Sequence, residues 1–127
     1  MADKVNRLDK LMKDGFLFLD GAMGTMLQKA GLKLGERPEA ICIEKPEIIT
    51  DIHRQYVEAG SRIVYANTFG ANRHKLEGTD LEVDKVIEAA VKCAKNAVEG
   101  TDAMVALDIG PIGELLEPSG TLSFESA

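Results

Sequence analysis

Residues 63–70 read Ile-Val-Tyr-Ala-Asn-Thr-Phe-Gly, an apolar run that passes directly into a polar turn ending in glycine. The same order occurs at residues 16–21, Phe-Leu-Phe-Leu-Asp-Gly, and at residues 104–110, Met-Val-Ala-Leu-Asp-Ile-Gly. Continuous apolar runs of this length are typical of strands buried on both faces of a parallel sheet. Because each polar turn follows its strand, we expect ligands to bind at the carboxyl ends of the strands.

Helical patterns separate these strands. Pro46 suits the first position of a helix, and apolar residues recur from there at helical spacing until Gly60. A second helix is predicted to start at the capping box formed by Thr79 and Glu82, to carry its apolar inner face from Val83 to Val98, and to end at Gly100. Two weaker patterns and one gap complete the chain: a short amphipathic helix at 3–13, a helical turn at 26–30, and irregular structure at 31–45.

The spacing of the strand ends sets the fold class. Asp20, Asn67 and Asp108 lie 47 and 41 residues apart, and one βα unit needs about 30 residues or more. We therefore predict an α/β fold of three successive βα units, with parallel strands and flanking helices. Three units make a sheet with two open edges, since a closed (β/α)8 barrel takes about 250 residues.

Composition excludes several classes of protein. The 127 residues are enough for one domain, and 15 Lys plus Arg against 21 Asp plus Glu give a net charge of −6. This acidic balance, without a basic run or any Trp, argues against nucleic-acid binding. No apolar segment approaches the roughly 20 residues of a membrane helix, and residues 1–13 are too charged for a signal peptide. We expect a cytoplasmic protein that contacts neither nucleic acid nor membrane.

The usual metal-ligand spacings are absent from the sequence. Cys42 and Cys93 lie 51 positions apart without a CxxC partner, and they are expected to be two reduced, packed thiols rather than a disulfide. Neither His53 nor His74 has a second ligand three or four residues away. His53 fits a surface or packed helix residue, and His74 fits a solvated charged turn. We therefore predict no metal site made from this chain.

Each polar turn leaves two interpretations open. Asp20 could hold the ammonium group of a ligand, or it could cap a helix or turn. Residues 67–70 could aim backbone N–H groups at a carboxylate, or they could form a well-capped loop. Residues 108–113 carry two glycines and a proline, which indicate a rigid turn that either contacts the ligand or only shapes the rim.

Taken together, these turns resemble one protein family. Residues 18–27 (Phe-Leu-Asp-Gly-Ala-Met-Gly-Thr-Met-Leu), residues 67–76, and residues 108–113 with 118–120 resemble, in this order, the motifs of the homocysteine-binding methyltransferase domain. The resemblance covers about residues 16–125. Within the family it is greatest to the N-terminal region of cobalamin-dependent methionine synthases, and smaller to the betaine- and S-methylmethionine-dependent members.

The resemblance implies a fold and an activity. It implies that residues 1–127 are the N-terminal, incomplete portion of a (β/α)8 TIM barrel that binds homocysteine at the carboxyl ends of its strands. Three cysteine thiolates on later strands, beyond residue 127, would hold a zinc ion whose coordination the homocysteine sulfur completes. The resulting thiolate would attack the methyl group of methylcobalamin and give methionine. The cobalamin and folate sites would belong to partner domains of the same enzyme.

The resemblance also assigns residues. Asp20 would face the amino-acid end of homocysteine, the 67–69 turn would line the pocket beside it, and the 108–110 turn would shape its rim. The implied substrate-binding residues are Asp20, Gly21, Asn67, Thr68, Phe69, Asp108 and Gly110. No catalytic residue and no zinc ligand falls within the chain. We therefore expect the 127-residue chain alone to be inactive.

Three alternatives remain from the sequence. The methyl donor could be betaine or S-methylmethionine instead of methylcobalamin. The chain could be a non-catalytic α/β module that self-associates through its open strand edges, since unpaired backbone groups seek partners. It could also be an unrelated doubly wound α/β domain, although it lacks the glycine fingerprint of a phosphate loop.

Overall fold

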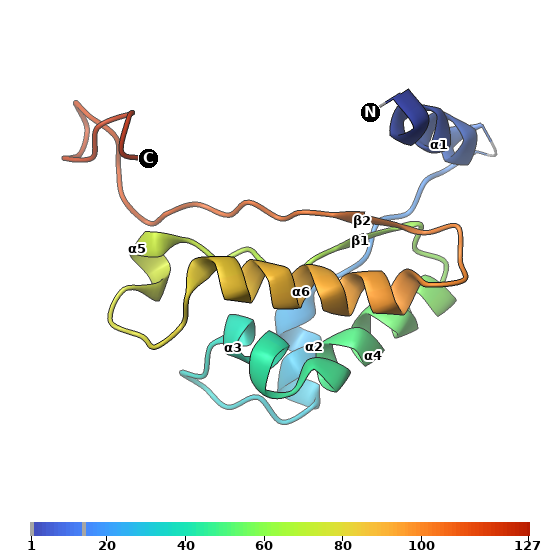
Figure 1. Ribbon diagram of the computed structural model, residues 1–127, viewed down its shortest axis with the longest axis horizontal. Coiled ribbons are helices and arrows are strands. Elements are labelled where there is room, and N and C mark those ends of the chain that lie inside the picture. The colour runs from blue at the N-terminus through green and yellow to red at the C-terminus, as the bar shows by residue number, and fades with distance from the viewer. Residues whose placement is uncertain (1, 14) are drawn as a thin grey trace.

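The computed structural model describes residues 2–13 and 15–127, so Met1 and Asp14 lie outside the described residues. Along the chain the elements are α1 (Ala2–Met12), α2 (Met23–Lys29), α3 (Pro38–Glu44), α4 (Pro46–Glu58), β1 (Ile63–Tyr65), α5 (Arg73–Leu76), α6 (Val83–Val98) and β2 (Met104–Ala106). Helices α2, α3, α4 and α6 lie on one side of the two strands, whereas α1 and the C-terminal segment project on the other (Figure 1). None of the helices in the described ranges is long and apolar enough to cross a membrane.

The two strands pair in parallel, as predicted. Their register places Val64 opposite Val105 and Tyr65 opposite Ala106. The predicted strand at residues 16–19 is reduced to one parallel bridge between Leu19 and Ile63. Backbone bonds on either side of that bridge join residues 18 to 62 and 20 to 63 at 2.8 and 3.0 Å. The spatial order of the three segments therefore follows their order in the chain.

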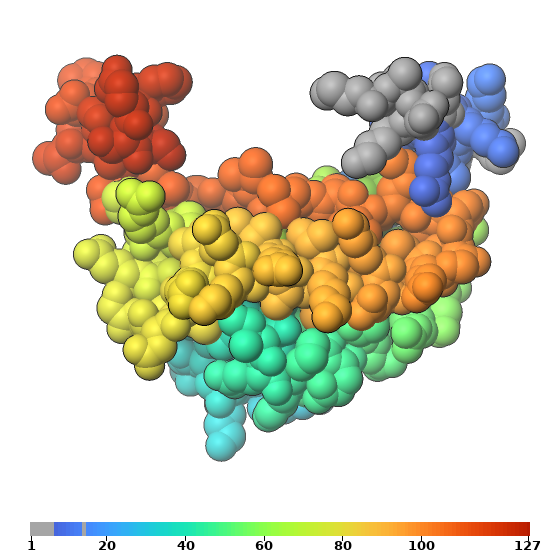
Figure 2. All heavy atoms as spheres, in the orientation of Figure 1, coloured from blue at the N-terminus to red at the C-terminus, as the bar shows by residue number. Residues whose placement is uncertain are grey.

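One face of the sheet is not covered by helices, and there the prediction that the strands are buried on both faces is wrong. Phe16 is 91% exposed and Phe18 is 64% exposed, so this run is not buried on both faces. In β1, Val64 is buried against the helices while Tyr65 is exposed, because successive side chains point to opposite faces of a strand. Figure 2 shows the C-terminal segment, drawn in red, rising from this open side of the sheet.

The core lies between the strands and the α4–α6 pair. Helix α4 begins with Pro46 at its first position and is followed by Gly60, whose φ of 115° favours glycine. Helix α6 buries three alanines, Ala90, Ala94 and Ala97. The buried apolar cluster contains Leu27, Ile41, Cys42, Ile49, Ile52, Val64, Ala66, Ala90, Cys93 and Ala94. Burying each large aliphatic side chain contributes about 1.5–3 kcal/mol to stability.

Three local predictions are wrong. Residues 38–44 form helix α3 rather than irregular structure, with Pro38 in its first turn and Ile41 buried. The capping box does not form, because α6 begins at Val83 and Glu82 makes no capping bond. The Thr79 hydroxyl instead accepts a hydrogen bond from the Leu81 amide at 3.2 Å, and so closes a turn before the helix. Helix α2 also begins at residue 23, earlier than the predicted turn at 26.

Candidate functional site

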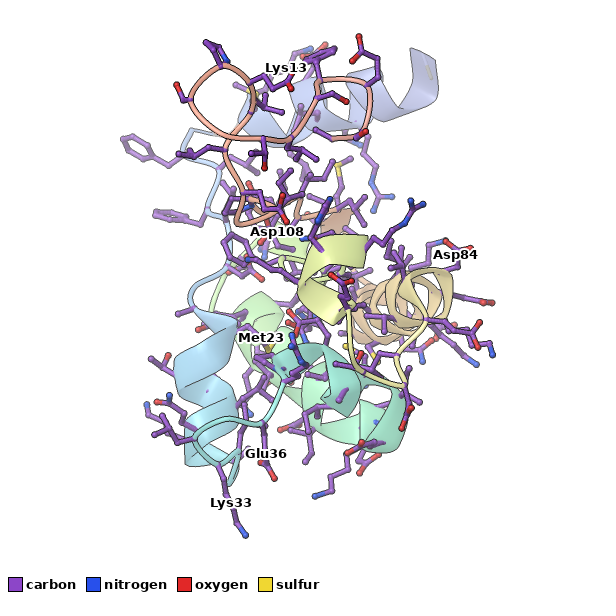
Figure 3. All side chains as sticks on the ribbon, turned by 90° about the vertical axis from the view of Figure 1, so that its left-hand side faces the viewer. Lys13, Met23, Lys33, Glu36, Asp84 and Asp108 are labelled. Atoms are coloured by element: carbon purple, nitrogen blue, oxygen red, sulfur yellow. The ribbon has the colours of Figure 1, made fainter. Side chains whose placement is uncertain are left out.

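The turns that follow the 16–19 segment, β1 and β2 meet at one edge of the sheet. The hydroxyl of Thr68 donates to the carbonyl oxygen of Asp108 at 2.7 Å and accepts from its amide at 3.1 Å. The backbone amide of Tyr65 donates to Oδ2 of Asp20 at 3.0 Å. Figure 3 shows Asp108 between the helical layer and the projecting terminal segments, far from the outer loop that carries Lys33 and Glu36. The predicted site residues therefore belong to one connected edge of the fold.

Asp20 does not cap a helix. Helix α2 is preceded by Ala22, and no side chain caps it. The Asp20 side chain is only 5% exposed, and Nδ1 of His53 lies 4.0 Å from its Oδ2. Burial raises the pKa of the Asp20 carboxyl group, the hydrogen bond from Tyr65 opposes this rise, and repulsion from Asp108 adds to it. An ammonium group placed here would relieve both the burial penalty and the repulsion.

Gly21 sits against helix α4. A Cβ atom at this position would lie 2.9 Å from the Tyr56 hydroxyl oxygen, so the absence of a side chain allows the close approach. The Tyr56 hydroxyl donates to the carbonyl oxygen of Ala22 at 2.9 Å. The aromatic ring of α4 therefore fixes the path of the first turn immediately after Asp20.

Asn67 is turned into the protein rather than toward the open edge. Its side-chain amide donates to the carbonyl oxygen of Pro38 at 2.8 Å and to Sγ of Cys42 at 3.3 Å. The buried carboxylate of Glu39 accepts the amide of Gly70 at 3.0 Å. Helix α3 thus holds both ends of the 67–70 turn. Sequence reasoning missed Glu39, because it appears as one more charge in a charged stretch.

Thr68 and Phe69 have different environments. Thr68 is 4% exposed and its hydroxyl is engaged with Asp108, so it joins two turns instead of lining an open surface. Phe69 is 50% exposed, and Nζ of Lys75 lies 4.7 Å from the centre of its ring. Gly110 packs under Phe69, where an added Cβ would meet the Phe69 carbonyl oxygen at 2.2 Å. Phe69, Asp20 and the backbone of the 108–110 turn remain placed to meet a ligand.

Comparison with known proteins shows the family to which the chain belongs. The family described as homocysteine S-methyltransferase matches residues 17–127. The chain belongs to the homocysteine S-methyltransferase family. The matched range contains all seven predicted site residues.

Relatives within the family differ in their activities. The chain is 44% identical over 73 residues to methionine synthase of Mycobacterium leprae, covering 53% of this chain and 6% of that protein. It is 32% identical over 106 residues to betaine–homocysteine S-methyltransferase 1 of Bos taurus, covering 78% of this chain and 26% of the relative. The chain therefore spans about a quarter or less of these two curated relatives.

A solved structure shares the fold. The metallated form of the homocysteine methyltransferase MmuM from Escherichia coli superposes with a TM-score of 0.74 at 28% identity. The match covers 84% of this chain and 42% of the MmuM chain. The arrangement of parallel strands and helices is thus that of a homocysteine methyltransferase over the matched part.

The cysteines of this chain do not suit zinc. Cys42 and Cys93 are both free and buried. Burial raises the pKa of the Cys42 thiol to about 12, against a smaller opposing effect of the hydrogen bond from Asn67. Burial also raises the pKa of Cys93. Within the described ranges no three His, Cys, Asp or Glu residues gather as a metal group, so no zinc step is assigned to residues of this chain.

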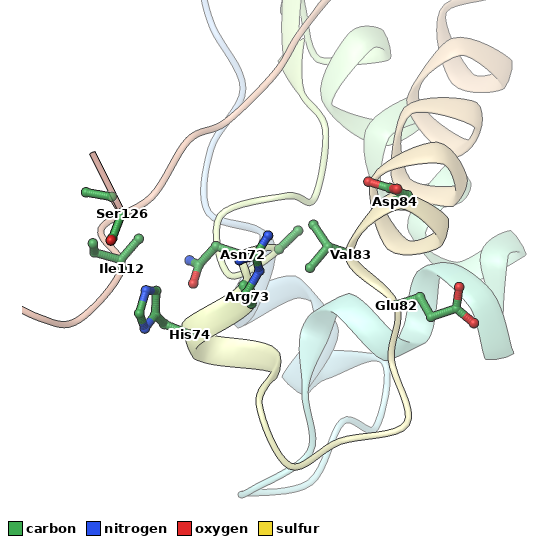
Figure 4. Close-up of a pocket in the computed structure, with 10 residues that line it drawn as sticks. Asn72, Arg73, His74, Glu82, Val83, Asp84, Ile112 and Ser126 are labelled. Carbon is green, nitrogen blue, oxygen red and sulfur yellow. The ribbon is translucent and has the colours of Figure 1, made fainter. Parts of the chain in front are cut away.

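A separate hollow of about 460 Å³ lies beside α5 and the start of α6 (Figure 4). Asn72 and Arg73 line it, and His74 lies beside Ile112. His74 belongs to α5 and its Nδ1 lies 3.1 Å from an oxygen of Glu114, so it is not simply a solvated turn residue. None of the seven predicted site residues lines this hollow, which distinguishes it from the strand-end site.

Proposed function

We propose that this chain supplies the amino-acid side of the homocysteine pocket in a homocysteine S-methyltransferase. The observation that carries the proposal is Asp20, a nearly buried carboxylate at the edge where the three turns meet. A carboxylate with little access to water favours a cationic partner, and homocysteine offers its ammonium group. Exposed Phe69 and the close-packed 108–110 turn would border the rest of the amino acid.

The full architecture belongs to the same proposal. Residues 1–127 would be the first three βα units of a (β/α)8 barrel, of which the 16–19 segment is the first strand. The sequential parallel order of the segments and the likeness to MmuM support this assignment. The uncovered face beside Tyr65 also supports it, because strands of a barrel need their inner face covered.

The methyl donor is the finer part of the proposal. We favour the methionine synthase type, in which methylcobalamin and methyltetrahydrofolate bind partner domains, because the higher identity is to methionine synthase. Betaine is the second candidate, since the match to the betaine-dependent relative covers more of this chain. Zinc, when bound by ligands outside this chain, would favour the thiolate form of homocysteine. Assaying the full-length gene product with methylcobalamin, betaine and S-methylmethionine in parallel distinguishes the donors.

The pocket itself is tested by calorimetry with the 127-residue chain. We expect L-homocysteine to bind, and the substitution Asp20→Ala to weaken binding at least tenfold, because a buried charge-assisted contact contributes about 1.5–3 kcal/mol. Substitution of the exposed Asp51 by Ala is the matched control and should leave binding unchanged. We expect no methionine from the chain with methylcobalamin. Formation above the uncatalysed rate, or homocysteine binding that ignores Asp20, would contradict the proposal.

A further inference from the structure

His53 is completely buried beneath the strand-end site. It lies on α4 beside the core residue Ile52, and its exposed fraction is 0%. Neither imidazole nitrogen has a hydrogen-bond partner among the described residues. Burying an unpaired polar group costs free energy, and an aliphatic residue would fill this position without that cost. Packing of the core alone therefore does not explain an imidazole at this position.

The only ionised group within ion-pair distance of His53, in the part of the chain that the structure describes, is Asp20. Nδ1 of His53 lies 4.0 Å from Oδ2 of Asp20, the same oxygen that accepts the Tyr65 amide. The other carboxylate oxygen, Oδ1, makes no hydrogen bond to another described residue. Contacts at ligand sites are often long without ligand and shorten when it binds. A small movement of either side chain would complete a hydrogen bond from Nδ1–H.

We propose that His53 is a positioning residue for Asp20. Its Nδ1–H is directed at Oδ2 and, together with the Tyr65 amide, holds the carboxylate so that Oδ1 faces the ammonium group of the amino-acid substrate. The substrate part of this inference rests on the proposed homocysteine pocket. The contact between the two side chains does not.

The charges around the pair agree with this role. Burial lowers the pKa of His53 to about 4, so at neutral pH the imidazole is uncharged and carries a single proton. Burial and repulsion from Asp108 raise the pKa of Asp20. A neutral donor at Oδ2 favours the ionised carboxylate without compensating its charge. The negative charge thus remains available for a cationic ligand.

The contact is tested first without any ligand. Nitrogen-15 NMR of the chain distinguishes the two imidazole tautomers, and the variant His74→Gln assigns the signals because the chain has two histidines. We expect the Nδ1–H tautomer at His53, and we expect Asp20→Ala to shift the population toward Nε2–H. An Nε2–H tautomer in the unsubstituted chain, or a His53 spectrum that ignores Asp20→Ala, would overturn the proposal.

A second measurement separates positioning from packing. His53→Leu removes the donor but keeps an apolar side chain in the core, whereas His53→Asn keeps an N–H at the place of Nδ1. We expect the carboxyl pKa of Asp20, followed by carbon-13 NMR, to rise further in His53→Leu and to return toward its original value in His53→Asn. Equal Asp20 pKa values in the two variants would contradict a positioning role.

The substrate part is tested by comparing two ligands. L-homocysteine carries the ammonium group, and 4-mercaptobutyrate has the same thiol and carboxylate without it. We expect His53→Leu to weaken homocysteine binding about tenfold, with less than a twofold change for 4-mercaptobutyrate. Equal losses for both ligands would overturn the inference. No homocysteine binding by the unsubstituted chain would instead overturn the proposed function, and the ligand-free spectra would still decide the His53–Asp20 contact.

Discussion

Gly110 lies where a methyl group would meet the carbonyl oxygen of Phe69 at 2.2 Å. Because the obstacle is backbone, the 108–110 turn would have to move away from the 67–70 turn. We expect Gly110→Ala to lower the free energy of unfolding by about 1–3 kcal/mol, as measured by urea denaturation. Homocysteine binding should weaken as well, since the rim of the site would shift.

Gly24 provides the matched control. It lies within α2, and nothing would lie within 4 Å of an added Cβ. Gly24→Ala should therefore raise the free energy of unfolding by about 0.5–1 kcal/mol, because alanine favours the helix. Equal effects of the two substitutions would contradict the packing of Gly110 against Phe69.

His53 makes stability depend on pH in a stated direction. Its pKa of about 4 in the folded chain lies below the ordinary value of 6.5, so the folded state binds fewer protons between these pH values. The contribution of the neutral His53 to the free energy of unfolding is fully present above pH 6.5. It decreases as the pH falls from there and is lost once the pH has fallen through about 4. Between pH 7 and pH 4 the unsubstituted chain should lose up to about 3 kcal/mol of its free energy of unfolding through His53, as measured by urea denaturation. We expect His53→Leu to remove this loss.

The partly exposed His74 is the control for this measurement, because its imidazole lies at the surface beside Glu114. His74→Gln should retain the acid-dependent loss of stability. Retention of the full loss in His53→Leu would show that the dependence arises elsewhere.

Sequence reasoning at the residue level found the turns but not the contacts inside them. Asp20 was located because it ends an apolar run, and its two interpretations could not be separated without knowing what caps α2. Asn67 was expected beside the ligand, yet its amide meets α3. The roles of Glu39 and His53 depend on residues 31 and 33 positions away in the chain, at Gly70 and Asp20, and no local pattern reports such pairs.

Helix α3 acts on the site as an element. It places the Glu39 carboxylate against the Gly70 amide, and Glu39 as a whole is 7% exposed. We expect Glu39→Ala to lower the free energy of unfolding by about 1.5–3 kcal/mol, because the amide of Gly70 would lose a charge-assisted partner. Amide hydrogen exchange at residues 67–70, measured by NMR, should quicken in the same variant.

Two further variants make this prediction specific. Glu39→Gln keeps an acceptor oxygen near the Gly70 amide and should lose less stability than Glu39→Ala. Glu44→Ala, at an exposed position of the same helix, should change neither stability nor exchange. Unchanged exchange at the turn in Glu39→Ala would show that α3 does not hold it.

Long helices with a clear apolar period were predicted correctly, whereas the short helix α3 was not. The long amphipathic patterns of α4 and α6 and the apolar runs of β1 and β2 gave the correct type at nearly the correct place. Helix α3 was missed because it spans only seven residues, begins with Pro38 and follows a glycine-containing charged segment. The 16–19 run was expected to be a full strand, since local sequence does not tell how much of a sheet surrounds it.

At the scale of the molecule, the layer of helices leaves one face of the sheet uncovered. Tyr65 on β1 is 38% exposed, and Ile109 in the turn that follows β2 is 86% exposed. If the proposed barrel is correct, other strands cover this face; in the 127-residue chain, exposed apolar surface and an unpaired edge favour self-association. We expect sedimentation velocity to show association that increases with concentration.

A pair of variants locates the association. Ile109→Ser should reduce the association. Leu34→Ser should not, although Leu34 is even more exposed, because Leu34 lies in the outer loop between α2 and α3. Circular dichroism should be unchanged in both. A monomer at every concentration would contradict self-association and leave the barrel assignment to be judged by ligand binding.

The two buried thiols allow opening motions of the chain to be followed by their rates of alkylation. Cys42 lies on α3 and Cys93 on α6, and the Cys42 sulfur is covered by the amide of Asn67. Both side chains are at most 3% exposed, and both line one hollow between α3 and α6, so an alkylating reagent has to reach them through the seam between these two helices. The rate at which each thiol gains mass therefore reports how often α3 and α6 separate.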